Sequence, residues 1–304
     1  MKRKILAMIL SAAMVLSLAA CGSKGASAEG AATEVAETTE EVKEEVAEAT
    51  EEVAEATAEV AETTEAAAEE SDLAYVQEKG TLVVGITDFA PMDYKNEEGE
   101  WIGFDADLAK KFAEKLGVSV EFVEIDWDSK TMELDSKTID CVWNGMTLTD
   151  EVTSAMECSK AYCNNAQMVV LSNDKAAEYE TVESMSELTF AVEAGSAGEA
   201  EVNALGYNVN SVQSQAAALM EVAAGTSDAA VIDALMAAAM VGEGTGYADL
   251  TYTLGLNSEE YGVGFRKGSD LAEELNTFFA ESFADGSMMD VAKEYKVEAS
   301  IIEQ

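Results

Sequence analysis

Two aromatic residues stand among acidic residues rather than in apolar runs, and this setting suits the binding of a small organic cation. Asp88 precedes Phe89, and Trp127 lies between Asp126 and Asp128. Two rings that face one ligand offer a large apolar contact with little loss of rotamer freedom. An ammonium group near such a ring gains about 1–2 kcal/mol from the cation–π interaction when it is desolvated. Packing of both rings in the core is the alternative interpretation.

Two glycine-containing segments follow apolar stretches and offer main-chain groups to a ligand. The first is Asn144-Gly145-Met146-Thr147, where glycine lets the backbone approach a ligand closely. The second is Gly195-Ser196-Ala197-Gly198, which opens a predicted helix, and backbone N–H groups at a helix start favour an anion. This second segment lacks the lysine and the spacing of a nucleotide-binding loop. Ordinary strand-to-helix turns are the alternative for both segments.

A single carboxylate, Asp233, ends the apolar stretch 229–232. Side chains at the carboxyl ends of strands in an α/β sheet are well placed to contact a ligand. A charge-assisted hydrogen bond from a desolvated ammonium to such a carboxylate contributes about 1.5–3 kcal/mol. The alternative role for Asp233 is to cap the helix that is predicted from Ala234 onward.

The elements that must position these groups alternate between strand and helix. Asp105 is a candidate N-cap for a helix that runs to Leu116 and ends at Gly117. Thr149, followed by two acidic residues, marks the start of another helix. The predicted strands are 82–86, 118–125, 139–144, 166–171, 190–194, 229–232 and 262–265, and further helices are predicted near 128–137, after 198, and at 269–284 and 288–295. This alternation predicts mainly parallel sheets with covering helices, an α/β fold, and its two successive starts suggest two lobes.

The ordered set of motifs from Thr81 to Val170 resembles the first lobe of the family-3 extracellular solute-binding proteins, which bind polar amino acids and feed ABC importers. The resemblance includes the segment Trp101-Ile102-Gly103-Phe104-Asp105-Ala106-Asp107-Leu108 and extends over residues 73–298. It implies a two-lobed periplasmic-binding-protein type 2 fold with a hinged cleft. Lobe 1 would comprise residues 72–165 and 254–304, and lobe 2 residues 166–253.

The resemblance also implies a set of ligand-binding residues. The two aromatic rings would lie on either side of the ligand, the glycine carbonyl would accept from its ammonium group, and Asp233 would pair with that ammonium. The threonine after the glycine and the turn at 195–198 would hold its carboxylate. The residues in this set are Asp88, Phe89, Trp127, Asn144, Gly145, Thr147, Val152, Ser196, Ala197 and Asp233.

One position departs from the family pattern. Val152 stands where the family has an arginine that grips the α-carboxylate of the ligand with its planar fork. Apart from Arg3, the only arginine in the chain is Arg266, which matches a family position away from the cleft. Either another donor replaces the missing arginine, or the ligand is not a standard α-amino acid. In the second case Asp88 and Asp233 would favour an amine-bearing ligand.

The N-terminal segment predicts export and lipid anchoring. Residues 1–20 combine a basic start with a short apolar stretch, as in a signal peptide, and Leu-Ala-Ala-Cys resembles a bacterial lipobox that makes Cys21 the lipidated residue. An ordinary secretory signal is the alternative. Residues 21–71 form a low-complexity segment, with sixteen glutamates between Glu29 and Glu70. A solvated acidic tether is favoured over an oligomerising helix, because the apolar stripe is thin and its glutamates repel.

Composition excludes several classes of function. The chain carries a net charge of −42, so nucleic acid is an unsuitable partner. With no histidine in the chain and three cysteines beyond Cys21, neither a zinc site, a histidine-based catalytic site nor a disulfide framework is expected. We expect no cofactor and no catalysis. The expected partners are a small amino acid or amine, an ABC permease with its ATPase, and the bacterial membrane through the lipid.

Two other functions remain as alternatives to extracytoplasmic, lipid-anchored transport. A few relatives of this fold have become dehydratases, so an enzyme of dehydratase or lyase type on the same scaffold is one alternative. A sensory surface module that does not transport is the other.

Overall fold

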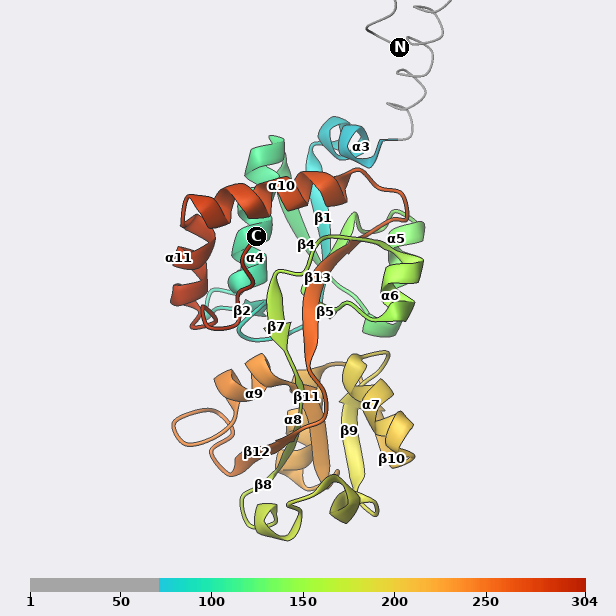
Figure 1. Ribbon diagram of the computed structural model, residues 1–304, viewed down its shortest axis with the longest axis vertical. Coiled ribbons are helices and arrows are strands. Elements are labelled where there is room, and N and C mark those ends of the chain that lie inside the picture. Colours follow the sequence, from blue (N-terminus) through green and yellow to red (C-terminus); the bar gives the residue numbers. More distant parts are fainter. Residues whose placement is uncertain (1–70) are drawn as a thin grey trace, which may run out of the picture. The chain divides into compact units, whose positions relative to one another are not determined.

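The computed structural model describes residues 71–304, in which two β-sheets are each covered by helices (Figure 1). The predicted signal peptide, Cys21 and the tether up to residue 70 lie outside the described residues. Within residues 71–304 no helix combines the length and the apolar composition needed to cross a membrane. The same residues contain three free thiols, Cys141, Cys158 and Cys163.

The first sheet has the strand order β4-β1-β5-β13-β6, with β7 also paired to β13. Its first three strands are parallel, while β13 runs antiparallel to β5, β6 and β7. Strand β5 is buried along nearly its whole length, which fits the apolar run Cys141-Val142-Trp143 at its start. The bounds are β1 (Thr81–Ile86), β4 (Ser119–Glu124), β5 (Cys141–Thr147), β6 (Glu157–Cys158), β7 (Cys163–Asn165) and β13 (Glu259–Phe265).

Helices cover both faces of this sheet, with α4 and α11 on one side and α5 and α6 on the other (Figure 1). Aromatic rings fill the core under α4 and α10, where Trp143 packs against Phe112 and Phe279 with ring centroids 6.2 and 5.6 Å away. The helices are α3 (Asp72–Lys79), α4 (Phe104–Leu116), α5 (Lys130–Asp135), α6 (Asp150–Ala155), α10 (Leu271–Ala284) and α11 (Ser287–Glu294), with the 3-10 turn η1 (Trp127–Ser129) and the hairpin β2 (Tyr94–Lys95) and β3 (Trp101–Ile102).

The second sheet has the order β10-β9-β11-β8-β12. Strand β9 runs parallel to β10 and β11, and β8 runs antiparallel to β11 and β12. Its strands are β8 (Gln167–Ser172), β9 (Thr189–Glu193), β10 (Asn208–Val212), β11 (Ala229–Asp233) and β12 (Leu250–Gly255). Its helices are α7 (Ala197–Leu205), α8 (Gln215–Ala224) and α9 (Ala234–Met240), with 3-10 turns η2 (Ala176–Glu178) and η3 (Val182–Met185). The predicted α/β class with two lobes is confirmed.

Strand β12 pairs with β8 as far as Gly255. Two sequence-based expectations need correction. Asp105 does not cap α4, because the N-cap is Gly103 at φ 132°, and a Cβ there would lie 2.1 Å from the carbonyl oxygen of Met92. One helix was expected between residue 198 and β11, whereas the chain forms α7, β10 and α8 there.

The C-terminal end of β13 is held by a buried ionic cluster. The Arg266 guanidinium donates to both carboxylate oxygens of Asp72 at 2.9–3.0 Å and to the Ile139 carbonyl at 2.8 Å. Asp140 receives hydrogen bonds from the Val83 N–H at 2.7 Å and the Lys79 ammonium at 2.6 Å. Because these groups come from α3, β1, β5 and β13, the cluster joins distant parts of the first lobe.

Arg266→Met should destabilise the protein by about 3–5 kcal/mol, because it leaves Asp72 buried without its charge partner. The midpoint of urea unfolding measures this loss. Lys293→Met is the matched control, since Lys293 forms only an exposed pair with Asp290, and its effect should stay within about 0.5 kcal/mol. Equal midpoints for the two variants would contradict a structural role for Arg266.

Candidate functional site

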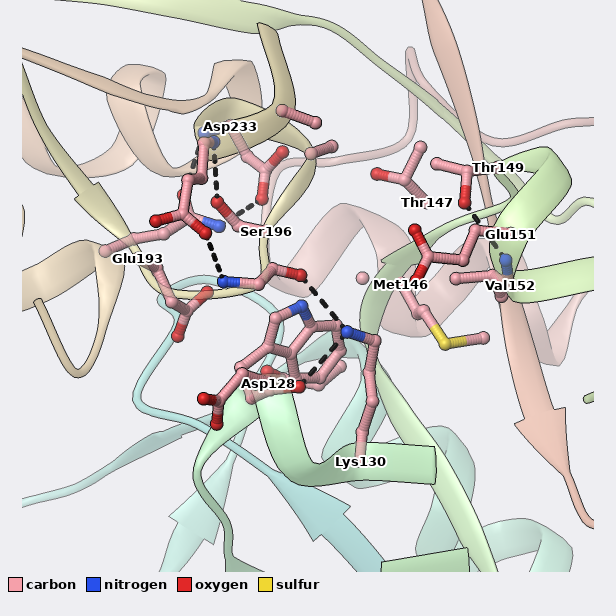
Figure 2. Close-up of a pocket in the computed structure, with 18 of the residues that line it drawn as sticks. Asp128, Lys130, Met146, Thr147, Thr149, Glu151, Val152, Glu193, Ser196 and Asp233 are labelled. Atoms are coloured by element: carbon pink, nitrogen blue, oxygen red, sulfur yellow. Dashed lines mark hydrogen bonds between the residues drawn. The ribbon is translucent and has the colours of Figure 1, made fainter. Parts of the chain in front are cut away.

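A pocket of about 330 Å³ lies between the two sheets and is lined by residues of both lobes (Figure 2). Glu193, Ser196 and Asp233 lie on one side, and Thr147, Thr149, Glu151 and Val152 on the other, with the Lys130 ammonium between them. Eight of the ten residues predicted from the sequence line this pocket: Trp127, Asn144, Gly145, Thr147, Val152, Ser196, Ala197 and Asp233.

Asp88 and Phe89 do not line the pocket. The Phe89 ring is only 1% exposed and packs edge-on against Tyr261 with centroids 6.4 Å apart. It lies directly behind Gly145, where a Cβ would come within 2.4 Å of the ring. A tight turn in which Phe89 and Asp93 exchange backbone hydrogen bonds directs the ring into the core. The pocket wall therefore has one ring, Trp127, rather than the expected pair.

The end of β5 is positioned by buried side chains. Asn144 uses its amide fully, accepting from the N–H and hydroxyl of Thr87 and donating to the Thr87 carbonyl and to Asp93. The Gly145 N–H donates to Asp105 at 2.8 Å, and Gly145 has φ 56°, a conformation that favours glycine. Asn144 therefore holds the main chain in place, while the backbone at Gly145 faces the pocket.

Asp233 is 4% exposed and is held by amide donors rather than by a base. Asn165 donates to it at 2.6 Å and Gln167 at 2.5 Å, and Gln215 donates to its second oxygen. Burial and the charge of Glu259 raise the pKa of Asp233 to about 7. It occupies the N-cap position of α9 without making a capping bond, which removes the alternative role as a helix cap.

Glu193, at the end of the neighbouring strand β9, is a pocket residue that the sequence reasoning missed. It is 3% exposed, and its Oε1 atom is buried with no hydrogen-bond partner among the described residues. Burial and the charge of Asp233 raise the pKa of Glu193 to about 8. The available signal was its place after the apolar stretch 190–192, which matches the place of Asp233 at the end of β11.

Lys130 is the second missed residue, and it is the only base among the pocket-lining residues of the described chain. Its ammonium donates to the carbonyls of Trp127 in the first lobe and Gly195 in the second, both at 3.1 Å. It also lies 4.9 Å from the centroid of the Trp127 ring. Burial lowers the pKa of Lys130, although the charges of Glu193, Glu151 and Asp128 act in the opposite direction.

The start of α7 already has an anionic partner. Ser196 caps the helix by accepting from the Glu199 N–H at 3.1 Å. The Glu199 carboxylate in turn accepts from the Gly195 N–H at 2.8 Å. A carboxylate of the protein therefore occupies part of the positive end of this helix, close to Ala197.

The opposite wall offers no strong anion-binding group. Val152 lies in the first turn of α6 and its N–H is taken by the Thr149 hydroxyl at 3.1 Å. Arg266 is outside the pocket lining and is engaged in the buried cluster with Asp72. Five carboxylates line the pocket against the single Lys130, so its chemistry suits a cation: Asp128, Glu151, Glu193, Glu199 and Asp233.

Comparison with known proteins places these features in a family. A sequence profile of the bacterial extracellular solute-binding proteins, family 3, matches residues 82–298. The histidine-binding periplasmic protein of Escherichia coli is 31% identical over 221 residues, which cover 68% of this chain and 84% of that protein.

Two solved structures extend the likeness to the fold. An ABC uptake transporter substrate binding protein from Streptococcus pneumoniae with bound histidine matches at 30% identity and a TM-score of 0.67, covering 74% of this chain and 96% of that one. The ancestral amino acid-binding protein AncCDT-1, a precursor of cyclohexadienyl dehydratase, matches at 29% identity and a TM-score of 0.68, covering 74% and 99%.

The raised pKa values of Glu193 and Asp233 predict that stability falls as pH rises. The folded state holds these protons more tightly than the unfolded chain, so the loss should occur between about pH 5 and about pH 8. Glu193→Gln removes the contribution of Glu193 to this pH dependence of stability and leaves that of Asp233. Its melting temperature should therefore exceed that of the parent by a few degrees at the upper pH and match it at the lower. Parallel pH profiles for the two proteins would show that Glu193 does not titrate in this range.

Proposed function

The chain belongs to the bacterial extracellular solute-binding proteins of family 3, and we propose that it captures a small amino acid or related amine and delivers it to an ABC permease. The observation that carries the proposal is Asp233, a buried carboxylate that faces the pocket from the end of β11 and has amide donors but no basic partner among residues 71–304. Such a group is completed by an ammonium from outside the protein.

The other lining residues would hold the rest of the ligand. In this proposal Trp127 covers its aliphatic part, and the backbone at Gly145 and the hydroxyl of Thr147 approach its polar groups. Ser196 and Ala197 would bound it from the second lobe. Val152 replaces the family's arginine and leaves that wall without a positive charge. Asn144 supports Gly145, and neither the buried Phe89 nor the exposed Asp88 would contact the ligand directly, because both lie outside the pocket lining.

Delivery would depend on closure of the two lobes around the ligand. A cation in the pocket would draw together the carboxylates of the second lobe and the Trp127 ring of the first, and the permease would recognise this closed form. The predicted lipid on Cys21 would hold the protein at the outer face of the bacterial membrane, with residues 22–71 as a tether. The permease and its ATPase would then receive a locally concentrated carrier.

We propose binding without turnover. The chain has no histidine, and no nucleophile is paired with a base in the pocket lining. The named relatives are binding proteins, although one is described as the precursor of a dehydratase. Mass spectrometry of ligand recovered after long incubation tests the proposal, and a changed ligand would favour the dehydratase or lyase alternative.

Asp233→Asn should weaken binding of an amine ligand by more than about tenfold, because it removes the charge from the ammonium partner. Isothermal titration against amino acids, their amine derivatives and polyamines measures the change. Asp228→Asn is the matched control at the other end of β11, where the side chain is 42% exposed. Undiminished affinity in Asp233→Asn would show that the ligand lies elsewhere.

Val152→Arg should create or tighten binding of an ordinary α-amino acid by about tenfold or more, because it restores a planar donor for the carboxylate. The same titration panel applies, with Val152→Leu as a control for side-chain size. If both variants bind the α-amino acids equally well, the identity of this residue does not set the specificity.

A further inference from the structure

We propose that Glu193 is a second cation-binding group of the pocket and that the ligand is an aliphatic diamine, with one ammonium at Asp233 and the other at Glu193. The inference rests on the proposed binding function and assigns its ligand class. The two carboxylates end the neighbouring parallel strands β9 and β11 and lie on the same wall of the pocket (Figure 2).

The first support is the unsatisfied state of Glu193. Its side chain is 3% exposed, it lines the pocket, and its Oε1 atom has no hydrogen-bond partner among the described residues. An acceptor left in this state is unfavourable unless a donor arrives with the ligand. Gln215 donates to Asp233 and accepts from the Asp233 N–H, and hydrogen bonding from Thr87 and Gln215 lowers the pKa of Glu193 only in part against the effect of burial.

The second support is the set of contacts that the Lys130 ammonium makes in the pocket. Lys130 reaches into the pocket from α5 and places its ammonium against two carbonyls and near the Trp127 ring. The pocket thus favours a primary ammonium beside this wall. The two carbonyl contacts use two of the three N–H donors of Lys130, which leaves one donor for a ligand.

The third support is the lack of any other strong site for a ligand carboxylate. Val152 replaces the arginine, and the Val152 N–H is taken by Thr149. Glu199 occupies the Gly195 N–H at the start of α7. A carboxylate on the ligand would therefore meet five carboxylates of the lining against the single Lys130, whereas a second ammonium would meet Glu193. A diamine of four or five carbons fits within a pocket of about 330 Å³.

Charged groups from several elements face the two acids. Asp233 and Glu259 lie close to each other, Lys130 approaches Glu193 from α5, and Glu151 lies on the opposite wall. The raised pKa values mean that the empty pocket retains protons near neutral pH. A diamine must displace these protons to pair with both carboxylates, so binding should release protons and strengthen as pH rises from about 6 to about 8.

The experiment is isothermal titration of the full chain with diaminobutane, diaminopentane, butylamine, ornithine and lysine. We expect a terminal diamine to bind at least about tenfold more tightly than butylamine and more tightly than ornithine or lysine. Titration of the parent protein in two buffers of different ionisation enthalpy should show proton release with the diamine. This second readout needs no variant.

Glu193→Gln should weaken diamine binding by about tenfold or more and change butylamine binding by less than about threefold, with reduced proton release. Glu187→Gln changes an exposed residue before β9 and should alter neither diamine binding nor butylamine binding.

Diamines that bind no better than butylamine would overturn the proposal, as would a Glu193→Gln variant that weakens diamine and butylamine binding equally. Tight binding of ornithine or another amino acid without dependence on Glu193 would overturn the diamine while leaving the binding function intact. No binding of any amine or amino acid by folded protein would overturn both.

Discussion

The burial of Asp233 without a basic partner is the constraint on which the rest of the site depends. The protein compensates for this charge with amide donors from the segment where the chain passes from the first sheet to the second, Asn165 at 2.6 Å and Gln167 at 2.5 Å. The same two amides also donate to Glu259, on the strand that returns to the first sheet. The amide groups that hold this pocket-facing acid are therefore the same groups that join the two crossings of the chain. A cation that binds Asp233 acts directly on the connection between the lobes, as closure around a ligand requires.

The basic residues of the first lobe and of the pocket have different roles. Arg266, the only arginine among residues 71–304, is used to neutralise Asp72 and Asp140 inside the first lobe. The pocket has only Lys130 against five carboxylates. A pocket with more carboxylates than basic residues selects ligands by charge. It repels an anionic ligand, whereas a cationic ligand neutralises its carboxylates. The chain as a whole is also acidic, with a net charge of −42, so the excess of carboxylates in the pocket follows the composition of the protein.

Most of the pocket was predictable because its parts follow strand ends, and strand ends are visible in the sequence. Trp127, Gly145, Ser196 and Asp233 were found in this way, together with the resemblance to the family. Glu193 was missed because a glutamate after an apolar stretch usually marks the point where a strand reaches solvent, whereas groups from several other elements surround it here. Phe89 was misplaced because the turn at 89–93 directs its ring behind Gly145, a tertiary contact that no local pattern encodes. Asp105 was taken for a helix cap for a similar reason, whereas it is buried and accepts from Gly145 and Tyr162.

Lys130 connects these observations. Its ammonium contacts a carbonyl from each lobe and lies over the indole of Trp127, so a cation already links the two halves of the pocket. In a site with an arginine at position 152, the carboxylate of the ligand would bring that strong donor and the second lobe together. Here the wall at Val152 carries no positive charge, and the Lys130 ammonium contacts two carbonyls and one ring. Ligand binding in such a pocket depends on how many carboxylates the guest can neutralise. If the proposal for Glu193 holds, its Oε1 atom, which has no hydrogen-bond partner among residues 71–304, makes the number of ammonium groups on the ligand more important than the presence of a carboxylate.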